Sequence, residues 1–297
     1  MDMRTVIVIG NGFDIDLGWH TSYKDFCQSM KSKWNTLLTK EDCLYNYVIN
    51  HVGENWFDLE RTIYDYCLKK STENTPKDLI DNDLEDFKSL KQELINFVSN
   101  RCKSPVSRNS CAFHLLNNYM EKLNQRSLPN DMIPKLYSFN YTPLEKVARI
   151  ISPNANFNYY PVHGTIENNN CIFGFLDDNK IKGKYRYIQK AMDDTYAPPS
   201  LKPALMDASK IIIFGVSMGF IDSVYFKDVF ERAALGGDYN TRKNFNITFV
   251  TYDEESKMNI KMNLQDIGIS IQSLMTNNNI KFLLTSEEPD LKDFDNL

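Results

Sequence analysis

Short runs of apolar, largely β-branched residues constrain this chain more than any other feature of its sequence. The strongest runs cover residues 5–9, 211–216 and 247–252, and weaker ones cover 135–138, 172–175 and 280–284. A run that is apolar at every position suits a parallel strand with helices on both of its faces. The sequence therefore predicts an α/β, Rossmann-like fold, with a mostly parallel sheet between two layers of helices.

Between about residue 22 and residue 125 the pattern changes to helical periodicity. Apolar stripes at helical spacing recur at 23–37, 84–97 and 113–123. The polar, proline-containing stretch 69–83 is expected to form a loop within this block. So long a stretch is uncommon as a plain connection. We therefore expect one α/β domain over 1–297, with a helical insertion at 27–130 after its first strand.

The composition narrows the class of partner. A formal net charge of -5 argues against a general electrostatic affinity for nucleic acid, and favours small-molecule ligands. The six cysteines form no C-x-x-C pair, so neither a metal site nor a disulfide framework is expected. No apolar run approaches the roughly 18 residues of a membrane span, and no secretory signal is recognised. We expect a cytoplasmic protein with no membrane contact.

The first predicted strand runs directly into Gly10, Asn11, Gly12, Phe13 and Asp14. A glycine turn between a strand and a helix can present backbone N–H groups and a positive helix dipole to an anion. The full dinucleotide fingerprint needs a third glycine at position 15, which is isoleucine here. Two interpretations stay open, a phosphate-binding turn or a tight corner. The Asp14 carboxylate would repel phosphate unless it faces ribose hydroxyls or caps a helix.

Two further polar residues follow predicted strands. Asn140 comes after the run at 135–138, where open parallel sheets bind ligands, although a cap or turn residue is the alternative. His163 precedes Gly164, whose small size would let a ligand approach the backbone closely. The alternative for His163 is an ordinary core or surface histidine.

A second glycine corner follows the run at 211–216. Ser217 could donate a hydrogen bond to a phosphate or ribose oxygen, and Asp222 could accept from ribose hydroxyls or cap a helix over 223–235. The segment G-V-S-M-G fits the G-x-S-x-G pattern of hydrolases. However, no histidine follows Ser217, which excludes the triad order of those enzymes within this chain.

Glu60 lies on the apolar side of a predicted acidic helix at 55–66. An unpaired carboxylate on such a face is costly. We therefore expect Glu60 to have a partner or to face a pocket, and a structural ion pair is the favoured account.

Taken together, six segments resemble the bacteriophage abortive infection AbiH family in order and spacing. They are I-G-N-G-F-D, G-W-H-T-S-Y-K-D-F, W-F-D-L-E, S-F-N-Y-T, V-H-G and F-G-V-S-M-G-F-I-D. That family is in turn similar to sirtuin-like domains, including those that destroy NAD in phage defence. The resemblance implies a sirtuin-like domain, a role in defence against phage and NAD as substrate or ligand.

The resemblance also implies roles for single residues. Asn140 would position the nicotinamide ribose or the attacking water, and His163 would be the catalytic base. Gly10 and Gly12 would form the phosphate-binding turn, and Ser217 would belong to the late loop that contacts the dinucleotide. Asn11 and Phe13 are bulkier than the small residues usual in the sirtuin glycine turn; with Asp14 and Asp222 they complete the expected nucleotide-binding residues. A zinc-binding cysteine quartet is missing from the sequence, which disfavours a protein deacylase.

The resulting expectation is an NAD glycohydrolase that needs no metal, with a phage-derived trigger and self-association as further partners. One alternative is a nucleotide-sensing module that binds a dinucleotide without turning it over. Another is a metal-dependent nucleic-acid hydrolase, in which Asp14, Glu60, Asp222 and His163 would hold the ion. The acidic net charge makes the nucleic-acid enzyme the less favoured of the two.

Overall fold

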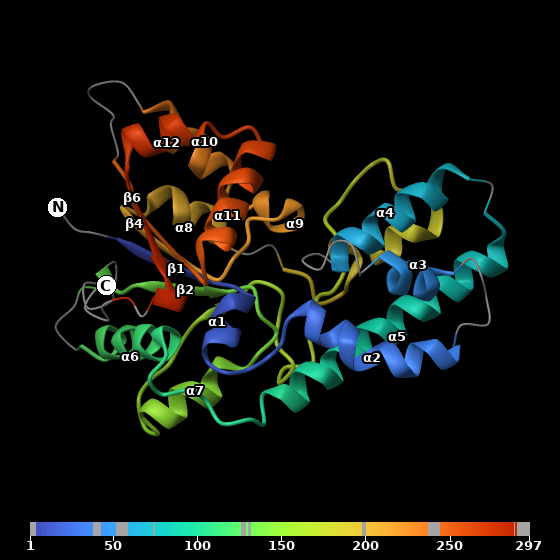
Figure 1. Ribbon diagram of the computed structural model, residues 1–297, viewed down its shortest axis with the longest axis horizontal. Helices are drawn as coiled ribbons and strands as arrows, with labels where there is room; N and C mark the ends of the chain where they lie inside the picture. The colour runs from blue at the N-terminus through green and yellow to red at the C-terminus, as the bar shows by residue number, and fades with distance from the viewer. Residues whose placement is uncertain are drawn as a thin grey trace. The chain divides into compact units, whose positions relative to one another are not determined.

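In the computed structural model of this protein, the chain forms two compact units (Figure 1). The structure describes residues 4–37, 43–51, 59–73, 75–125, 129, 132–197, 200–236, 244–287 and 289. The first, here called the sheet unit, comprises Met1–Trp19, Ser104–Val162 and Pro198–Leu297. The second, the helical unit, comprises His20–Lys103 and His163–Ala197.

The sheet unit is built on one parallel sheet. Its strands are β1 (Thr5–Ile9), β2 (Lys135–Ser138), β3 (Tyr160–Pro161), β4 (Lys210–Phe214), β5 (Asn246–Thr251) and β6 (Asn279–Leu284). They lie in the order β3-β2-β1-β4-β5-β6, and every neighbouring pair is parallel. This is the order of a doubly wound Rossmann sheet, so the predicted fold class is confirmed. The direction of strand addition reverses between β1 and β4.

Helices cover both faces of this sheet (Figure 1). One group contains α1 (Asn11–Asp16), α6 (Cys111–Leu123) and α7 (Leu144–Ile151). The other contains α8 (Leu201–Asp207), α9 (Phe220–Ser223), α10 (Lys227–Leu235), α11 (Glu254–Asp266) and α12 (Ile271–Asn277), and a short 3-10 turn, η4 (Thr285–Glu287), follows β6. Stacked rings link α10 to the sheet through Phe226, Phe230, Phe249 and Phe282. The helix expected over 223–235 is α10, which begins later, at Lys227, and the short α9 precedes it.

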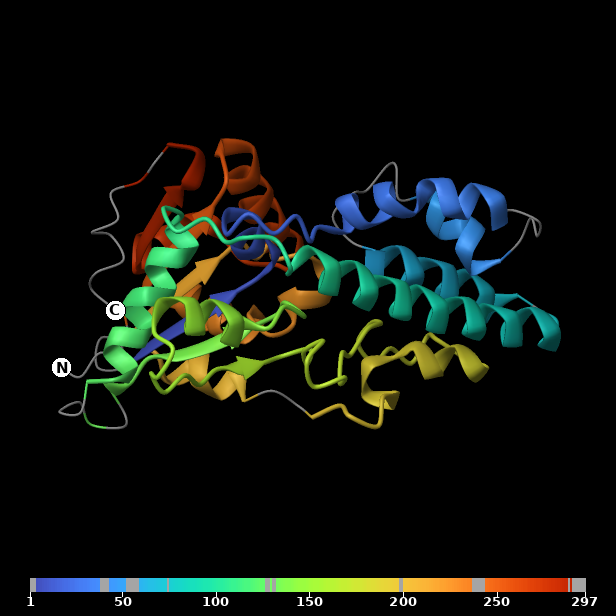
Figure 2. The same ribbon diagram turned by 90° about the horizontal axis from the view of Figure 1, so that it is seen from below.

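The helical unit contains α2 (Tyr23–Leu37), α3 (Leu44–His51), α4 (Leu59–Thr72) and α5 (Lys77–Arg101), with the 3-10 helices η2 (Gly183–Ile188) and η3 (Lys190–Met192). α3 contacts α2, α4 and α5, and η2 packs on α4 and α5 (Figure 2). The bounds of the helical unit differ from those of the expected insertion at 27–130. α6 belongs to the sheet unit, and residues 163–197 belong to the helical unit. The loop expected over 69–83 is wrong: α4 continues to Thr72 and α5 begins at Lys77.

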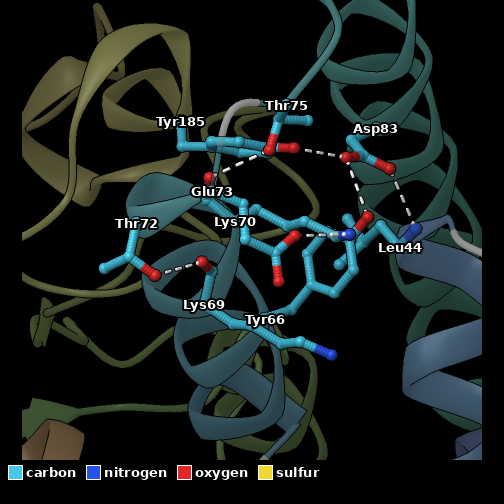
Figure 3. Close-up of polar contacts among 9 residues, drawn as sticks. All are labelled: Leu44, Tyr66, Lys69, Lys70, Thr72, Glu73, Thr75, Asp83 and Tyr185. Carbon is cyan, nitrogen blue, oxygen red and sulfur yellow. Dashed lines mark hydrogen bonds and ion pairs between the residues drawn. The ribbon is translucent and has the colours of Figure 1, made fainter.

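A buried carboxylate organises the core of the helical unit (Figure 3). Asp83 is fully buried, and it accepts hydrogen bonds from the backbone N–H of Leu44 at 2.9 Å and the hydroxyls of Tyr66 and Tyr185 at 2.9 and 2.6 Å. Burial raises the pKa of Asp83, and its three donors act in the opposite direction. One side chain thus joins α3, α4, α5 and η2.

Among the helices of the described residues, none combines the length and the apolar character required to cross a bilayer.

Candidate functional site

The glycine turn after β1 packs directly against the end of β4. The N–H of Gly10 donates to the carbonyl of Phe214 at 2.9 Å, and that of Gly12 donates to the carbonyl of Gly215 at 3.0 Å. A Cβ on Gly12 would lie 2.6 Å from the Cα of Gly215, closer than carbon atoms can approach. Gly215 itself has a left-handed φ of 65°. These glycines therefore have a conformational role, that of two loops in backbone contact.

The same hydrogen bonds limit what the turn can offer to an anion. The N–H groups of Gly10 and Gly12 are used by β4, and that of Phe13 donates to the carbonyl of Gly10 at 2.9 Å. The Phe13 side chain is buried, and its ring packs edge-on against Phe214. Asn11 is half-buried, at the first position of α1. A phosphate at this corner would have to be held by groups other than these three N–H donors.

Asp14 faces an amide and a hydroxyl at the end of the sheet where the parallel strands have their carboxyl ends. Its side chain is buried, and Oδ1 accepts from Nδ2 of Asn140 at 2.9 Å and from Oγ1 of Thr142 at 3.1 Å. The Asn140 amide also donates to the carbonyl of Gly10 at 2.9 Å. Asp14 lies in the first turn of α1, where the helix dipole favours a negative charge. The network thus joins the end of β2 to the turn after β1.

The loop after β4 contributes less to this network. The Ser217 side chain is exposed, and its carbonyl accepts from Nδ2 of Asn263 at 2.7 Å. The next residue, Met218, is buried and has a left-handed φ of 58°. Such a conformation is strained for a residue with a side chain, and strain of this kind is common at functional sites. Asp222 is half-buried within α9.

His163 belongs to the helical unit, where it is part of a buried polar cluster. Nζ of Lys190 lies 3.5 Å from its Nδ1 and 2.9 Å from Oε2 of Glu60. The second Glu60 oxygen accepts from the N–H of Gly174 at 3.3 Å. Lys190 is 1% exposed. The expected ion pair of Glu60 is therefore confirmed, with Lys190 as its partner. Residues 55–58, at the start of that predicted helix, lie outside the described residues.

The Lys190 contact determines what His163 can do. A lysine ammonium only donates hydrogen bonds, so a hydrogen bond from Lys190 requires Nδ1 of His163 to accept, which assigns the ring proton to Nε2. In this arrangement His163 is a hydrogen-bond donor at Nε2. It can act as a general base only after the contact with Lys190 has opened.

The residues expected at the site therefore occupy two units. The sheet unit holds Gly10, Asn11, Gly12, Phe13, Asp14, Asn140, Ser217 and Asp222, and the helical unit holds His163. The structure brings Asp14 and Asn140 into contact, and places the Gly12 turn on Gly215. The sequence interpretation missed Thr142 and Lys190. Only the expectation of a cation for Glu60 pointed toward one of them.

The described residues contain no group of three or more His, Cys, Asp or Glu side chains placed to hold a metal ion.

Comparison with known proteins gives one informative match. No curated protein matches the chain. Residues 6–237 match the family model described as bacteriophage abortive infection AbiH, a span that starts in β1 and ends just after α10. That range contains the Gly12 turn, the Asp14 network and the His163 cluster. The match covers well over half of the chain, which therefore belongs to the bacteriophage abortive infection AbiH family.

Proposed function

We propose that this protein acts in abortive-infection defence by binding NAD or a related nucleotide and hydrolysing its nicotinamide glycosidic bond. The family supports the defence role. The strand order supports a nucleotide site, because open parallel sheets bind ligands where the order reverses, here between β1 and β4. The observation that carries the proposal is the buried network of Asp14, Asn140 and Thr142 beside that point.

The side chains of Asp14 and Asn140 suit the ribose of a nucleotide better than its phosphates. A buried carboxylate beside an amide suits neutral hydroxyl groups, or a ribose that becomes positively charged, and it opposes phosphate. The three N–H groups of Gly10, Gly12 and Phe13 already have carbonyl partners. We propose that Asn11 and Ser217 hold the phosphates instead. Asn11 is half-buried and Ser217 is exposed.

In the proposed reaction, the bond between ribose C1′ and the nicotinamide nitrogen breaks, and its electron pair leaves with neutral nicotinamide. Water forms the new C–O bond and loses a proton. Nicotinamide needs no acid to leave, so orientation of the ribose and stabilisation of its positive charge are the main tasks. Asn140 would perform the first task and Asp14 the second. A base role for His163 requires the Lys190 contact to open first.

Release of nicotinamide from NAD by the purified protein tests the proposal. Asn140→Ala should lower the rate by at least about tenfold, because the oriented ribose is lost. Asn96→Ala, on the exposed face of α5, and His20→Ala, at another exposed position, are matched controls for Asn140→Ala and His163→Ala. Equal release by the wild type, Asn140→Ala and His163→Ala would refute the assignment.

One observation favours the second candidate, a sensor that binds a nucleotide without turnover. The predicted base, His163, is buried and has Nδ1 beside an ammonium group. Calorimetric binding of NAD, followed by recovery of all the NAD intact, would support the sensor over the hydrolase.

A further inference from the structure

The orientation of the Asn140 side chain is fixed by its neighbours. Nδ2 lies 2.9 Å from Oδ1 of Asp14 and 2.9 Å from the carbonyl oxygen of Gly10. Neither oxygen carries a proton to donate when Asp14 is ionised, so both can only accept. A flipped amide would place its own oxygen against these two oxygens. The NH₂ group must therefore face Asp14 and Gly10, and both of its hydrogens are used.

This leaves the amide oxygen as the only group of the side chain that can meet a ligand. Within the described part of the chain, no donor bonds Oδ1 of Asn140, although the residue is only 7% exposed. This oxygen is not among the fully buried side-chain atoms that lack a partner, so it can be reached from solvent. Phosphate oxygens cannot supply a hydrogen at neutral pH, whereas a sugar hydroxyl can. The geometry thus selects for an O–H donor.

Asp14 is in turn oriented by Thr142. The Thr142 hydroxyl donates to the same Oδ1 atom that receives the Asn140 amide, at 3.1 Å. Thr142 lies two residues beyond Asn140, just before α7, so both donors come from the segment after β2. The buried carboxylate lies in the first turn of α1 and therefore links the two loops.

We propose that Asp14, oriented by Thr142, is a positioning residue that locks the Asn140 amide with its oxygen ready to accept a hydrogen bond from a ribose hydroxyl. This inference rests on the proposed function, since it names the part of the nucleotide that Asn140 recognises. It makes the site selective for ribose over deoxyribose, and it gives Asp14 a role in recognition that requires no direct contact with phosphate.

The test compares dissociation constants for NAD and for two analogues that lack either the 2′- or the 3′-hydroxyl of the nicotinamide ribose. The wild type should bind NAD about tenfold more tightly than at least one analogue. Asp14→Ala should bring that ratio close to one. Asp14→Asn retains an acceptor oxygen for the Asn140 amide and should restore part of the ratio.

Thr142→Val is the milder variant, since it removes one hydroxyl and conserves the shape of the side chain. It should reduce the ratio in the same direction by a smaller factor, which keeps the test usable if Asp14→Ala does not fold. An unchanged ratio in the variants, or equal weakening of all three ligands, would overturn the positioning role.

A measurement without ligand separates this inference from the proposed function. In NMR spectra of the free wild-type protein, both Nδ2 protons of Asn140 should exchange slowly with water, and Asp14→Ala should abolish that protection. Unprotected amide protons in the wild type would refute the locked amide. If they are protected but NAD does not bind, the proposed function and the ribose contact fail together, while the positioning of Asn140 by Asp14 stands.

Discussion

Replacement of Gly12 by alanine distinguishes a tight corner from an open phosphate-binding turn by the sign of its effect on stability. Gly12 is the second residue of α1, and alanine is favoured over glycine within a helix by about 0.5–1 kcal/mol. With free space above the turn, Gly12→Ala should therefore stabilise the protein. The structure instead places the new Cβ 2.6 Å from the Cα of Gly215.

That collision involves backbone atoms, which no change of side-chain rotamer can relieve. Carbon atoms in contact normally lie about 3.5–4.0 Å apart, so the two loops must separate by roughly 1 Å. Overpacking that moves the backbone costs about 1–3 kcal/mol. After subtraction of the helix preference, we expect Gly12→Ala to lower the free energy of unfolding of the sheet unit by about 1–2 kcal/mol.

Urea unfolding followed by the fluorescence of Trp19 measures this quantity. Trp19 is buried in the sheet unit, and its indole N–H donates to the carbonyl of Ser104 at 3.0 Å. Trp34→Phe and Trp56→Phe in the background remove the other two tryptophans from the signal. Asn11→Ala, at the preceding position of α1, is the control and should change stability little. If Gly12→Ala is as stable as the wild type or more stable, the close contact with Gly215 is wrong.

Three further predictions concern the helical unit. Tyr185→Phe removes a donor to a buried carboxylate and should lower the free energy of unfolding by about 1.5–3 kcal/mol, whereas Tyr187→Phe, at a 65% exposed position, should have little effect in the same denaturation experiment. Lys190→Met leaves Glu60 buried without its cation and should cost about 3–5 kcal/mol in thermal or urea unfolding; the double variant with Glu60→Gln should recover much of this loss, and no recovery would argue against the pair. Because burial raises the pKa of Asp83 above 3.8, the folded protein holds this proton more tightly than the unfolded chain, so the group's contribution to stability is present below pH 3.8 and is lost as pH rises through the folded pKa. The unfolding free energy of the wild type minus that of Asp83→Asn, measured from below pH 3.8 upward, should fall as the pH rises. A rise would contradict the raised pKa of Asp83.

The sheet could be predicted because its central strands carry their own signal. β1 is buried at every position and β4 at every position after its first, so each reads as an uninterrupted apolar run. The weak run at 172–175 misleads, since Phe175 makes only an isolated bridge with Gln189. β3 is two residues long, which is too short for a periodic pattern to mark.

The helical block shows where local patterns fail. Charges and a proline suggested a loop over 69–83, but most of this stretch belongs to the ends of two helices, and Pro76 immediately precedes α5. Proline is tolerated at a helix start because the first N–H groups have no partner within the helix. Asp83, at the end of the expected loop, is instead the buried acceptor of three donors.

The sequence indicated which residues of the site need a partner, but not which residues those partners are. The apolar face around Glu60 favoured an ion pair, but Lys190 is separated from Glu60 by 130 residues, a pairing that no local spacing encodes. The role of Gly12 depends on contact with Gly215, at the end of a strand more than two hundred residues later. The partner of Asp14 was likewise open until Asn140 and Thr142 were placed beside it.

We propose that Asp14 and Asn140, at the carboxyl ends of the strands, receive the ribose of a nucleotide. A crystal structure of the protein with NAD, or with an analogue that resists hydrolysis, tests it most directly. We predict a ribose hydroxyl oxygen about 2.7–2.9 Å from Oδ1 of Asn140, with the amide still bonded to Asp14. A nucleotide bound elsewhere, or a ribose beyond hydrogen-bond distance of Asn140, would contradict the account.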